Sequence, residues 1–184
     1  MRVVSGSARG RRLKEPQGMD IRPTADQVKE AMFSIAREET PGARVLDAFA
    51  GTGQLGIEAL SRGAAECVFC DQSPASLAIV RENVKLCGFG ERSKILRGDV
   101  KKLLPGLGKF DMILLDPPYA SDNYEECLNI IFQIDILCQH GIIICESLKE
   151  RQMPPARPPY EMGREYRYGS KKLTVYRRTE ADNV

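Results

Sequence analysis

Short apolar runs that alternate with helical patterns constrain the fold of this 184-residue chain more than any other feature. Four runs have the length and unbroken apolar character of strands buried on both faces of a sheet, and a fifth is weaker. The four cover residues 44–49, 66–71, 110–116 and 141–147, and the weaker run covers 93–97. Strands that alternate with helices over short connections predict an α/β fold with a mostly parallel, helix-covered sheet.

The helical patterns between these runs have recognisable ends. One covers residues 55–62 and stops at Gly63. A second begins at Ser73 and Pro74, an N-cap followed by proline at the first helical position, and ends before Gly88. A third covers about residues 124–138. Two last runs, 160–168 and 171–178, are separated by two residues, and they predict an antiparallel hairpin that completes a seven-stranded sheet.

A basic extension precedes this core. Residues 2–8 and 11–14 flank Arg9-Gly10 and predict a small hairpin. Farther along, Thr24 is expected to cap a helix of about sixteen residues, with Gln27 completing a capping box. We therefore divide the chain into an extension over 1–40, a core domain over 41–178 and a tail over 179–184.

Charge is segregated along the chain, although the formal net charge is only +2. The first fourteen residues hold five basic residues and no acid, residues 41–148 hold ten basic and fourteen acidic, and residues 149–178 hold nine basic and three acidic. Clusters of Lys and Arg favour phosphate backbones as partners, although ordinary solvated surface charge is an equal alternative. The candidate contacts are Arg2, Arg9, Arg11, Arg12, Arg22, Lys171 and Lys172.

Membrane, export and metal functions are disfavoured. No apolar run approaches the roughly 20 residues that span a bilayer, and the basic start lacks the apolar centre of a signal peptide, so we expect a cytoplasmic protein. Cys67 and Cys70 have CxxC spacing but lie within a predicted buried strand, and the single His140 is remote in sequence. A zinc site needs about four ligands, so reduced buried thiols are the favoured interpretation and we expect no metal.

A glycine-rich turn follows the first strand. Residues 51–56 read Gly-Thr-Gly-Gln-Leu-Gly, and Asp71 ends the next strand twenty residues after Gly51. This pattern suits several adenosine cofactors, NAD included, because glycines admit close approach and the acid accepts ribose hydroxyls. Asp47 just before the turn would repel a pyrophosphate and attract the cationic S-adenosylmethionine. A turn without a ligand is the alternative, and Asp99 is equally an adenine contact or a helix N-cap.

The tetrapeptide Asp116-Pro117-Pro118-Tyr119 follows the fourth strand, at the sheet edge where α/β folds place ligands. The Asp116 carboxylate and Pro117 carbonyl can accept both hydrogens of a base's exocyclic amine while Tyr119 stacks on the ring. Holding both hydrogens favours attack by an otherwise poorly nucleophilic amine on a sulfonium methyl group. A plain Pro-Pro turn is the alternative.

Together these stretches resemble the bacterial RsmD family of 16S ribosomal RNA guanine-N2 methyltransferases. The resemblance rests on Arg-Pro-Thr at 22–24, on residues 1–10 (MRVVSGSARG), 45–53 (VLDAFAGTG) and 55–64 (LGIEALSRGA), on Asp-Pro-Pro-Tyr at 116–119 and on Tyr168-Gly169. Asp-Pro-Pro-Tyr alone would also suit adenine-N6 and cytosine-N4 methyltransferases. Thr52, Asp71 and Ser34 depart from the common Ser, Glu and Asn of the family, and the shorter acid at 71 leaves the ribose geometry open.

The resemblance implies a class I, Rossmann-like methyltransferase fold, S-adenosylmethionine as donor, and one guanine of small-subunit RNA as substrate, with the extension contacting RNA. The implied cofactor residues are Asp47, Phe49, Gly51, Gly53, Asp71, Gln72, Asp99 and Val100, and the implied guanine-binding residues are Asp116, Pro117 and Tyr119. The rivals are a DNA amino-methyltransferase, which usually needs an extra recognition segment, a non-catalytic RNA-binding protein and a nicotinamide oxidoreductase. We expect a monomer that acts on 16S RNA within the small subunit or an assembly intermediate.

Overall fold

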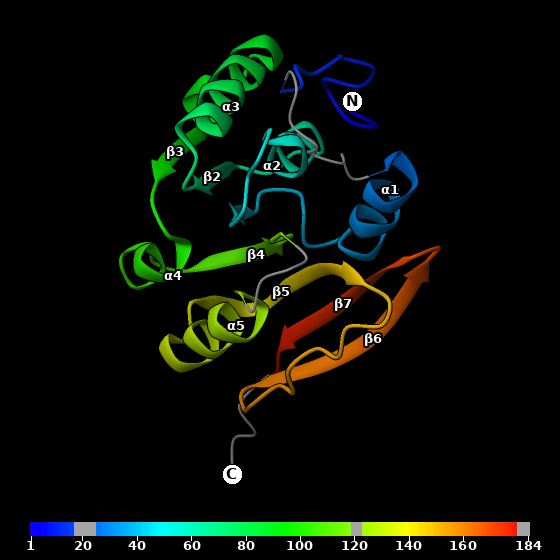
Figure 1. Ribbon diagram of the computed structural model, residues 1–184, viewed down its shortest axis with the longest axis vertical. Coiled ribbons are helices and arrows are strands. Elements are labelled where there is room, and N and C mark those ends of the chain that lie inside the picture. The colour runs from blue at the N-terminus through cyan, green and yellow to red at the C-terminus, as the bar shows by residue number, and fades with distance from the viewer. Residues whose placement is uncertain (17–24, 119–122, 180–184) are drawn as a thin grey trace.

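A seven-stranded sheet forms the centre of the computed structural model, which describes residues 1–16, 25–118 and 123–179. The strand order is β3-β2-β1-β4-β5-β7-β6; the first five strands are parallel, and β7 runs antiparallel to both β5 and β6 (Figure 1). The strands are β1 (Arg44–Asp47), β2 (Glu66–Asp71), β3 (Ser93–Arg97), β4 (Phe110–Leu115), β5 (Leu137–Leu148), β6 (Tyr160–Tyr168) and β7 (Lys171–Arg178). The predicted Rossmann-like α/β fold with its closing hairpin is confirmed.

Helices cover both faces of the sheet and enclose two apolar cores. The α-helices are α1 (Asp26–Ile35), α2 (Gln54–Ser61), α3 (Pro74–Cys87), α4 (Val100–Leu103) and α5 (Asn123–Ile134), and the short 3-10 helices are η1 (Gly90–Arg92) and η2 (Leu104–Gly106). One core joins α1, α2, α3 and the N-terminal residues to one sheet face, and the other joins α4 and α5 to the opposite face. Neighbouring strand residues such as Val45 and Leu46 enter different cores, as the alternation of a strand requires.

Helix α3 begins and ends as its sequence predicts. The Ser73 hydroxyl accepts a hydrogen bond from the Ser76 N–H at 3.2 Å, Pro74 occupies the first turn, and Gly88 closes the helix with φ of 75°. Both ends therefore follow from local chemistry.

The boundaries of four other predicted elements are wrong. Helix α1 has ten residues rather than about sixteen and is preceded by Ala25, which offers no capping side chain; Thr24 lies outside the described residues. Helix α5 ends at Ile134 instead of 138, and β5 begins at Leu137 instead of 141. The apolar Leu137 and Cys138 continue the helical spacing in sequence, but Asp135 adopts φ of 48° and ends the helix. The first strand also stops at Asp47, two residues early.

The N-terminal residues form the expected antiparallel loop, reduced to a single bridge between Arg2 and Arg12. The Val3 N–H donates to the Arg11 carbonyl at 3.0 Å and the Gly10 N–H to the Val3 carbonyl at 2.9 Å. Val3, Ala8 and Leu13 are buried in the core that contains α2 and α3. The loop is thus part of the folded domain.

The described part of the chain shows neither a metal site nor a membrane-spanning helix. The six cysteines are free thiols, and no group of three or more His, Cys, Asp or Glu side chains there is placed to hold a metal ion. Burial raises the pKa of Cys70 to about 12, which suits an inert structural thiol. No helix in the described segments combines the length and apolarity needed to cross a bilayer.

Candidate active site

The candidate site lies where the chain changes direction across the sheet. From β1 the chain continues to β2 and β3 on one side, whereas β4 pairs with β1 on the other side. Helix α2 after β1 and helix α5 after β4 cover opposite faces. In open α/β sheets such a switch point creates a crevice at the carboxyl ends of the strands. Asp47, Asp71 and Asp116 all lie at this edge, as the sequence predicts.

The segment from Ala48 to Gly53, here called the glycine loop, is held between two strands. The Ala48 N–H donates to the Leu114 carbonyl of β4 at 3.1 Å, and the Ala50 N–H donates to the Cys70 carbonyl of β2 at 2.9 Å. The Gly51 N–H donates to Asp71 Oδ2 at 2.8 Å. These bonds fix the loop above the switch point before any ligand arrives.

The three glycines of the loop motif serve different purposes. Gly51 and Gly53 have φ of 53° and 80°, which favour glycine, and a Cβ added at Gly51 would meet nothing within 4 Å. Gly56 instead faces β2, where an added Cβ would overlap the Phe69 ring. The space above Gly51 is open to a ligand, whereas Gly56 lets α2 pack closely on the sheet.

Asp47 is almost fully buried, and its Oδ2 accepts a hydrogen bond from the Gly56 N–H at 2.9 Å. Burial raises the pKa of Asp47 to about 7, and the negative charge of the nearby Asp71 acts in the same direction. The hydrogen bond from Gly56 partly opposes this rise in pKa. Sequence reasoning did not anticipate that Asp47 holds the first turn of α2. Any cation near this carboxylate would favour its ionised form.

The carboxylate of Asp71 accepts one backbone bond on each oxygen. Oδ2 accepts from Gly51 and Oδ1 accepts from the Ser73 N–H, both at 2.8 Å. A carboxylate offers about four acceptor positions, so ribose hydroxyls can still bind it. Asp99 caps α4 by accepting from the Lys101 N–H at 3.1 Å, which realises one of its two expected roles.

Gln54 is a further candidate that sequence reasoning missed. It is the first residue of α2, directly after the glycine loop, and its Oε1 is buried without a hydrogen-bond partner among the described residues. A buried acceptor without a hydrogen bond costs about 1–3 kcal/mol, and a ligand N–H that bonds to it would recover this free energy. The open space above Gly51, the acids and this acceptor together fit a cationic adenosyl ligand.

The other predicted ligand residues are distributed around this edge. Phe49 is half-buried in the glycine loop, Gln72 is exposed after β2, and Val100 is buried at the start of α4. Asp116 is half-buried and Pro117 is buried directly after β4. Tyr119 lies outside the described residues, so stacking on a base stays a prediction.

The predicted RNA contacts do not form one group. Arg9, Arg11 and Arg12 are exposed and form no ion pair with a described residue, whereas Arg2 is exposed and pairs with Asp26. Lys172 is 4% exposed and pairs with Glu165, and Lys171 pairs with the buried Glu146. Burial and pairing make Lys171 and Lys172 less accessible than the exposed arginines, and whether they contact RNA stays a prediction. Arg22 lies outside the described residues.

Comparisons with known proteins agree with this geometry. A family model described as "Conserved hypothetical protein 95" matches residues 1–177. The "Putative rRNA methyltransferase YlbH" of Bacillus subtilis is 36% identical over 97% of this chain and 99% of its own length. The "Ribosomal RNA small subunit methyltransferase D" of Escherichia coli is 29% identical over 97% of this chain and 90% of its own length. The solved structure of the "Putative methyltransferase yhhF" from Escherichia coli matches with a TM-score of 0.87 and 29% identity, covering 98% of this chain and 99% of that one.

Proposed function

This chain belongs to the RsmD family, described as Conserved hypothetical protein 95, and from that premise we propose that it methylates the N2 amine of a guanine in 16S ribosomal RNA with S-adenosylmethionine as donor. Two named relatives that match nearly the whole chain, one from Bacillus subtilis and one from Escherichia coli, are rRNA methyltransferases by name. The observation that carries the proposal is the position of Asp116 and Pro117, directly after β4 and beside the glycine loop at the switch point.

Each group at this edge has a task in the proposal. Gly51 and Gly53 leave the backbone open to the donor, and Asp71 accepts the ribose hydroxyls with its remaining acceptor positions. Burial raises the pKa of Asp47 to about 7, and the positive charges of a bound donor would shift it toward the ionised form, which attracts them. The buried Gln54 oxygen is a candidate acceptor for the donor's ammonium group. When bound, S-adenosylmethionine supplies a methyl group activated by a sulfonium.

Asp116 and the Pro117 carbonyl orient the guanine amine by accepting one hydrogen bond from each of its two N–H groups. As the nitrogen becomes tetrahedral its hydrogens gain positive charge, so these two acceptors bind the transition state more strongly than the planar amine. With a donor bound, attack by the amine would form the N–C bond, break the donor's S–C bond and leave a neutral thioether, and the extra amine proton would pass to water. Positioning and electrostatics supply the catalysis.

The test offers purified protein and labelled donor to under-methylated small subunits, to naked 16S RNA and to DNA, and then maps the modified base. We expect label on guanine N2 of the RNA. Label on adenine, or on DNA alone, would overturn the guanine assignment in favour of an amino-methyltransferase of another class. A protein that binds RNA but labels no substrate would be a binding protein that retains the fold.

The role of Asp116 has its own test. We expect Asp116→Ala to abolish transfer while donor affinity, measured by calorimetry, stays within about twofold, because the residue holds the acceptor base. Asp111→Ala is the matched control, since Asp111 lies at the opposite end of the strand that Asp116 follows and accepts a bond from the Arg44 N–H. Simultaneous loss of donor binding and transfer in Asp116→Ala would mean that the residue is structural.

A further inference from the structure

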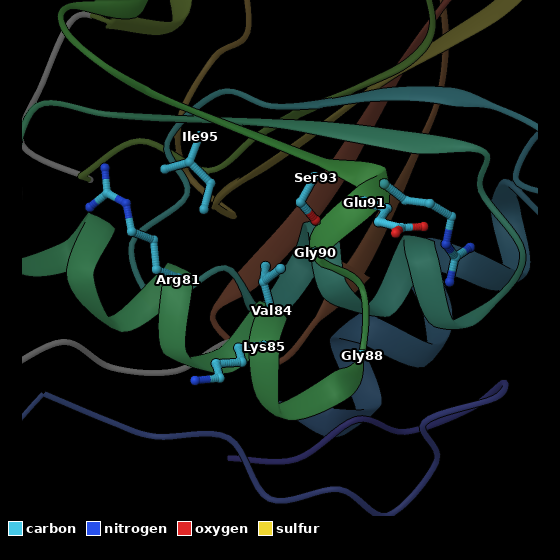
Figure 2. Close-up of a pocket in the computed structure, with 9 residues that line it drawn as sticks. Arg81, Val84, Lys85, Gly88, Gly90, Glu91, Ser93 and Ile95 are labelled. Atoms are coloured by element: carbon cyan, nitrogen blue, oxygen red, sulfur yellow. The ribbon is translucent and has the colours of Figure 1, made fainter.

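A hollow of about 590 Å³ lies between α3, η1 and β3, outside the candidate active site. Arg81, Val84 and Lys85 line it from α3, and Ile95 lines it from β3 (Figure 2). Val84 is 4% exposed and Ile95 is half-buried, so these two give the hollow an apolar part of its lining. Gly88 and Gly90 line it at the turn after α3, and an added Cβ at either position would meet nothing within 4 Å.

The cations of this hollow differ in how they are held. The Arg92 guanidinium donates to the Ala64 carbonyl at 3.0 Å and lies 4.7 Å from the centre of the Phe89 ring, so it is fixed in place. Arg81 and Lys85 are exposed, one helical turn apart, and neither forms an ion pair with a described residue. One acid, Glu91, lines the hollow beside these three cations. The local charge is therefore positive and two of its sources are available to a partner.

The basic N-terminal loop lies directly against the same helix. Lys14 pairs with Glu82 of α3, its N–H donates to Asn83 Oδ1 at 2.7 Å, and Asn83 Nδ2 donates back to the Lys14 carbonyl at 3.1 Å. Lys14 thereby neutralises the acid between Arg81 and Asn83. Arg11 is close enough to Cys87, at the end of α3, to lower the pKa of that thiol, which burial raises. Figure 1 shows the N-terminal loop beside α3.

We propose that Arg81 and Lys85 bind the phosphate backbone of the substrate RNA in this hollow, so that the RNA-contacting surface extends from the N-terminal loop across α3 to β3. The inference rests on the proposed function, because it assigns a second contact region to the same substrate. Phosphate contacts of this kind position an RNA without reading its sequence. The active-site edge and this surface then hold the RNA at separate places, which selects for a folded RNA over a short strand.

The experiment compares Arg81→Ala/Lys85→Ala with the matched pair Arg37→Ala/Arg157→Ala. The control removes two exposed cations that line neither the hollow nor the active-site edge. Binding to under-methylated small subunits and to naked 16S RNA is measured across a salt series, together with S-adenosylmethionine affinity and methylation kinetics. Thermal unfolding verifies that each variant is folded.

For the hollow variant we expect RNA affinity to fall about tenfold and the slope of log K against log salt to decrease by about 1.4–1.8, the value for two phosphate contacts. The KM for RNA should rise, whereas kcat at saturating RNA and the affinity for the donor should not change. The control pair should stay within about twofold of the native chain.

Three outcomes would overturn the inference while the proposed function stands. They are native RNA affinity in the hollow variant, an equal loss in the control pair, and a changed donor affinity in the hollow variant. A native chain that neither binds nor methylates RNA would instead defeat the proposed function, and the inference with it.

Discussion

Two segments of this chain have similar net positive charges, +5 over residues 1–14 and +6 over residues 149–178, but the fold uses that charge differently. Residues 1–14 carry five basic residues, of which Arg9, Arg11 and Arg12 are exposed without an ion-pair partner among the described residues. Residues 149–178 carry nine basic residues, of which Lys149, Lys171, Lys172, Arg177 and Arg178 form ion pairs with acids. Within the described residues, the first segment leaves three neighbouring cations exposed and pairs only Arg2 and Lys14, whereas the second uses five of its nine cations within the fold.

Three of the five acids that pair with the C-terminal cations are remote in sequence. Arg177 pairs with Glu39 after α1, Lys171 pairs with Glu146 on β5, and Arg178 pairs with Asp135 after α5. A count of charge along the chain cannot include these partners, since the sheet brings them together. Available charge is therefore a property of the surface. Arg81 and Lys85 of α3 show the converse case, because they are exposed although they lie within the acidic centre of the sequence.

The largest expected effect comes from releasing the N-terminal loop. The fully buried Glu58 accepts the Val4 N–H at 2.8 Å and the Ser5 N–H at 2.9 Å and also pairs with Arg62. We expect Glu58→Ala to lower the free energy of unfolding, measured in urea, by about 3–5 kcal/mol, because it breaks a buried pair and leaves backbone donors unpaired.

The control is Glu30→Ala, because Glu30 pairs with the same Arg62 from an exposed position. It should cost about 0–1 kcal/mol. Equal losses in the two variants would show that the loop is not anchored through Glu58 and that the two basic segments differ less than the structure indicates.

The second effect tests the available charge directly. We expect Arg9→Ala/Arg11→Ala/Arg12→Ala to weaken RNA binding by about tenfold to a hundredfold and to decrease the salt slope by about 2–3, because three phosphate contacts are lost. The free energy of unfolding should change by less than about 0.5 kcal/mol, since the three side chains are exposed. An unchanged salt slope would remove the N-terminal loop from the RNA surface.

The third effect concerns Lys172, whose side chain is 5% exposed and whose Nζ lies 2.5 Å from Glu165 Oε1. We expect Lys172→Ala to lower the free energy of unfolding by about 1–2 kcal/mol, because Glu165 is left in a partly buried site without its cation. RNA affinity should stay within about twofold. The stability control is Arg167→Ala, because Arg167 is exposed and lies opposite Lys172 in the register of β6 and β7. A loss of RNA affinity without a loss of stability would restore Lys172 as an RNA contact.

Much of the fold follows from local sequence signals. Strand β2 and helix α3 occupy the predicted residues because a buried apolar run, the Ser73 cap and Gly88 each act locally. The α5–β5 boundary could not be predicted in this way, because Leu137 and Cys138 satisfy a helical and a strand pattern alike. Pairing of Leu137 with Phe110 of β4, a tertiary contact, decides between them.

For the candidate site, the sequence predicts where the acids lie better than it predicts which hydrogen bonds they form. Strand ends and glycine spacing place Asp47, Asp71 and Asp116 at one edge, as expected. The sequence could not reveal that Asp47 is bonded to Gly56, or that Gln54 has a buried oxygen without a partner, because both depend on how α2 packs on the sheet. The sequence pattern identifies which side chains lie at the same edge of the sheet. How the helices pack on the sheet determines which atoms of those side chains already form hydrogen bonds.

The smallest expected effect is a difference in pH dependence between the two segments. The hydrogen bond from the Arg178 guanidinium is the main reason that the pKa of Asp135 lies well below its ordinary value. Burial raises this pKa, but hydrogen bonds from Tyr160 and Lys109 lower it further. An acid with a depressed pKa stabilises the fold above its ordinary pKa of about 3.9, and this stability is lost as the pH falls below that value. We expect Asp135→Asn to cost about 1 kcal/mol at pH 7 and progressively less below about pH 4, measured by urea unfolding across pH.

Asp26, which pairs with Arg2 in the N-terminal segment, provides the matched control. Burial raises the pKa of Asp26, but the bond from Arg2 and the charges of Lys29 and Arg2 outweigh it and lower that pKa. Its side chain is 41% exposed, and solvent screens such a pair, so Asp26→Asn should cost only about 0.3 kcal/mol at any pH above 4. If the two variants lost equal stability with the same pH dependence, the N-terminal charge would be stabilising the fold as the C-terminal charge does. The contrast between an available and a consumed set of cations would then be wrong.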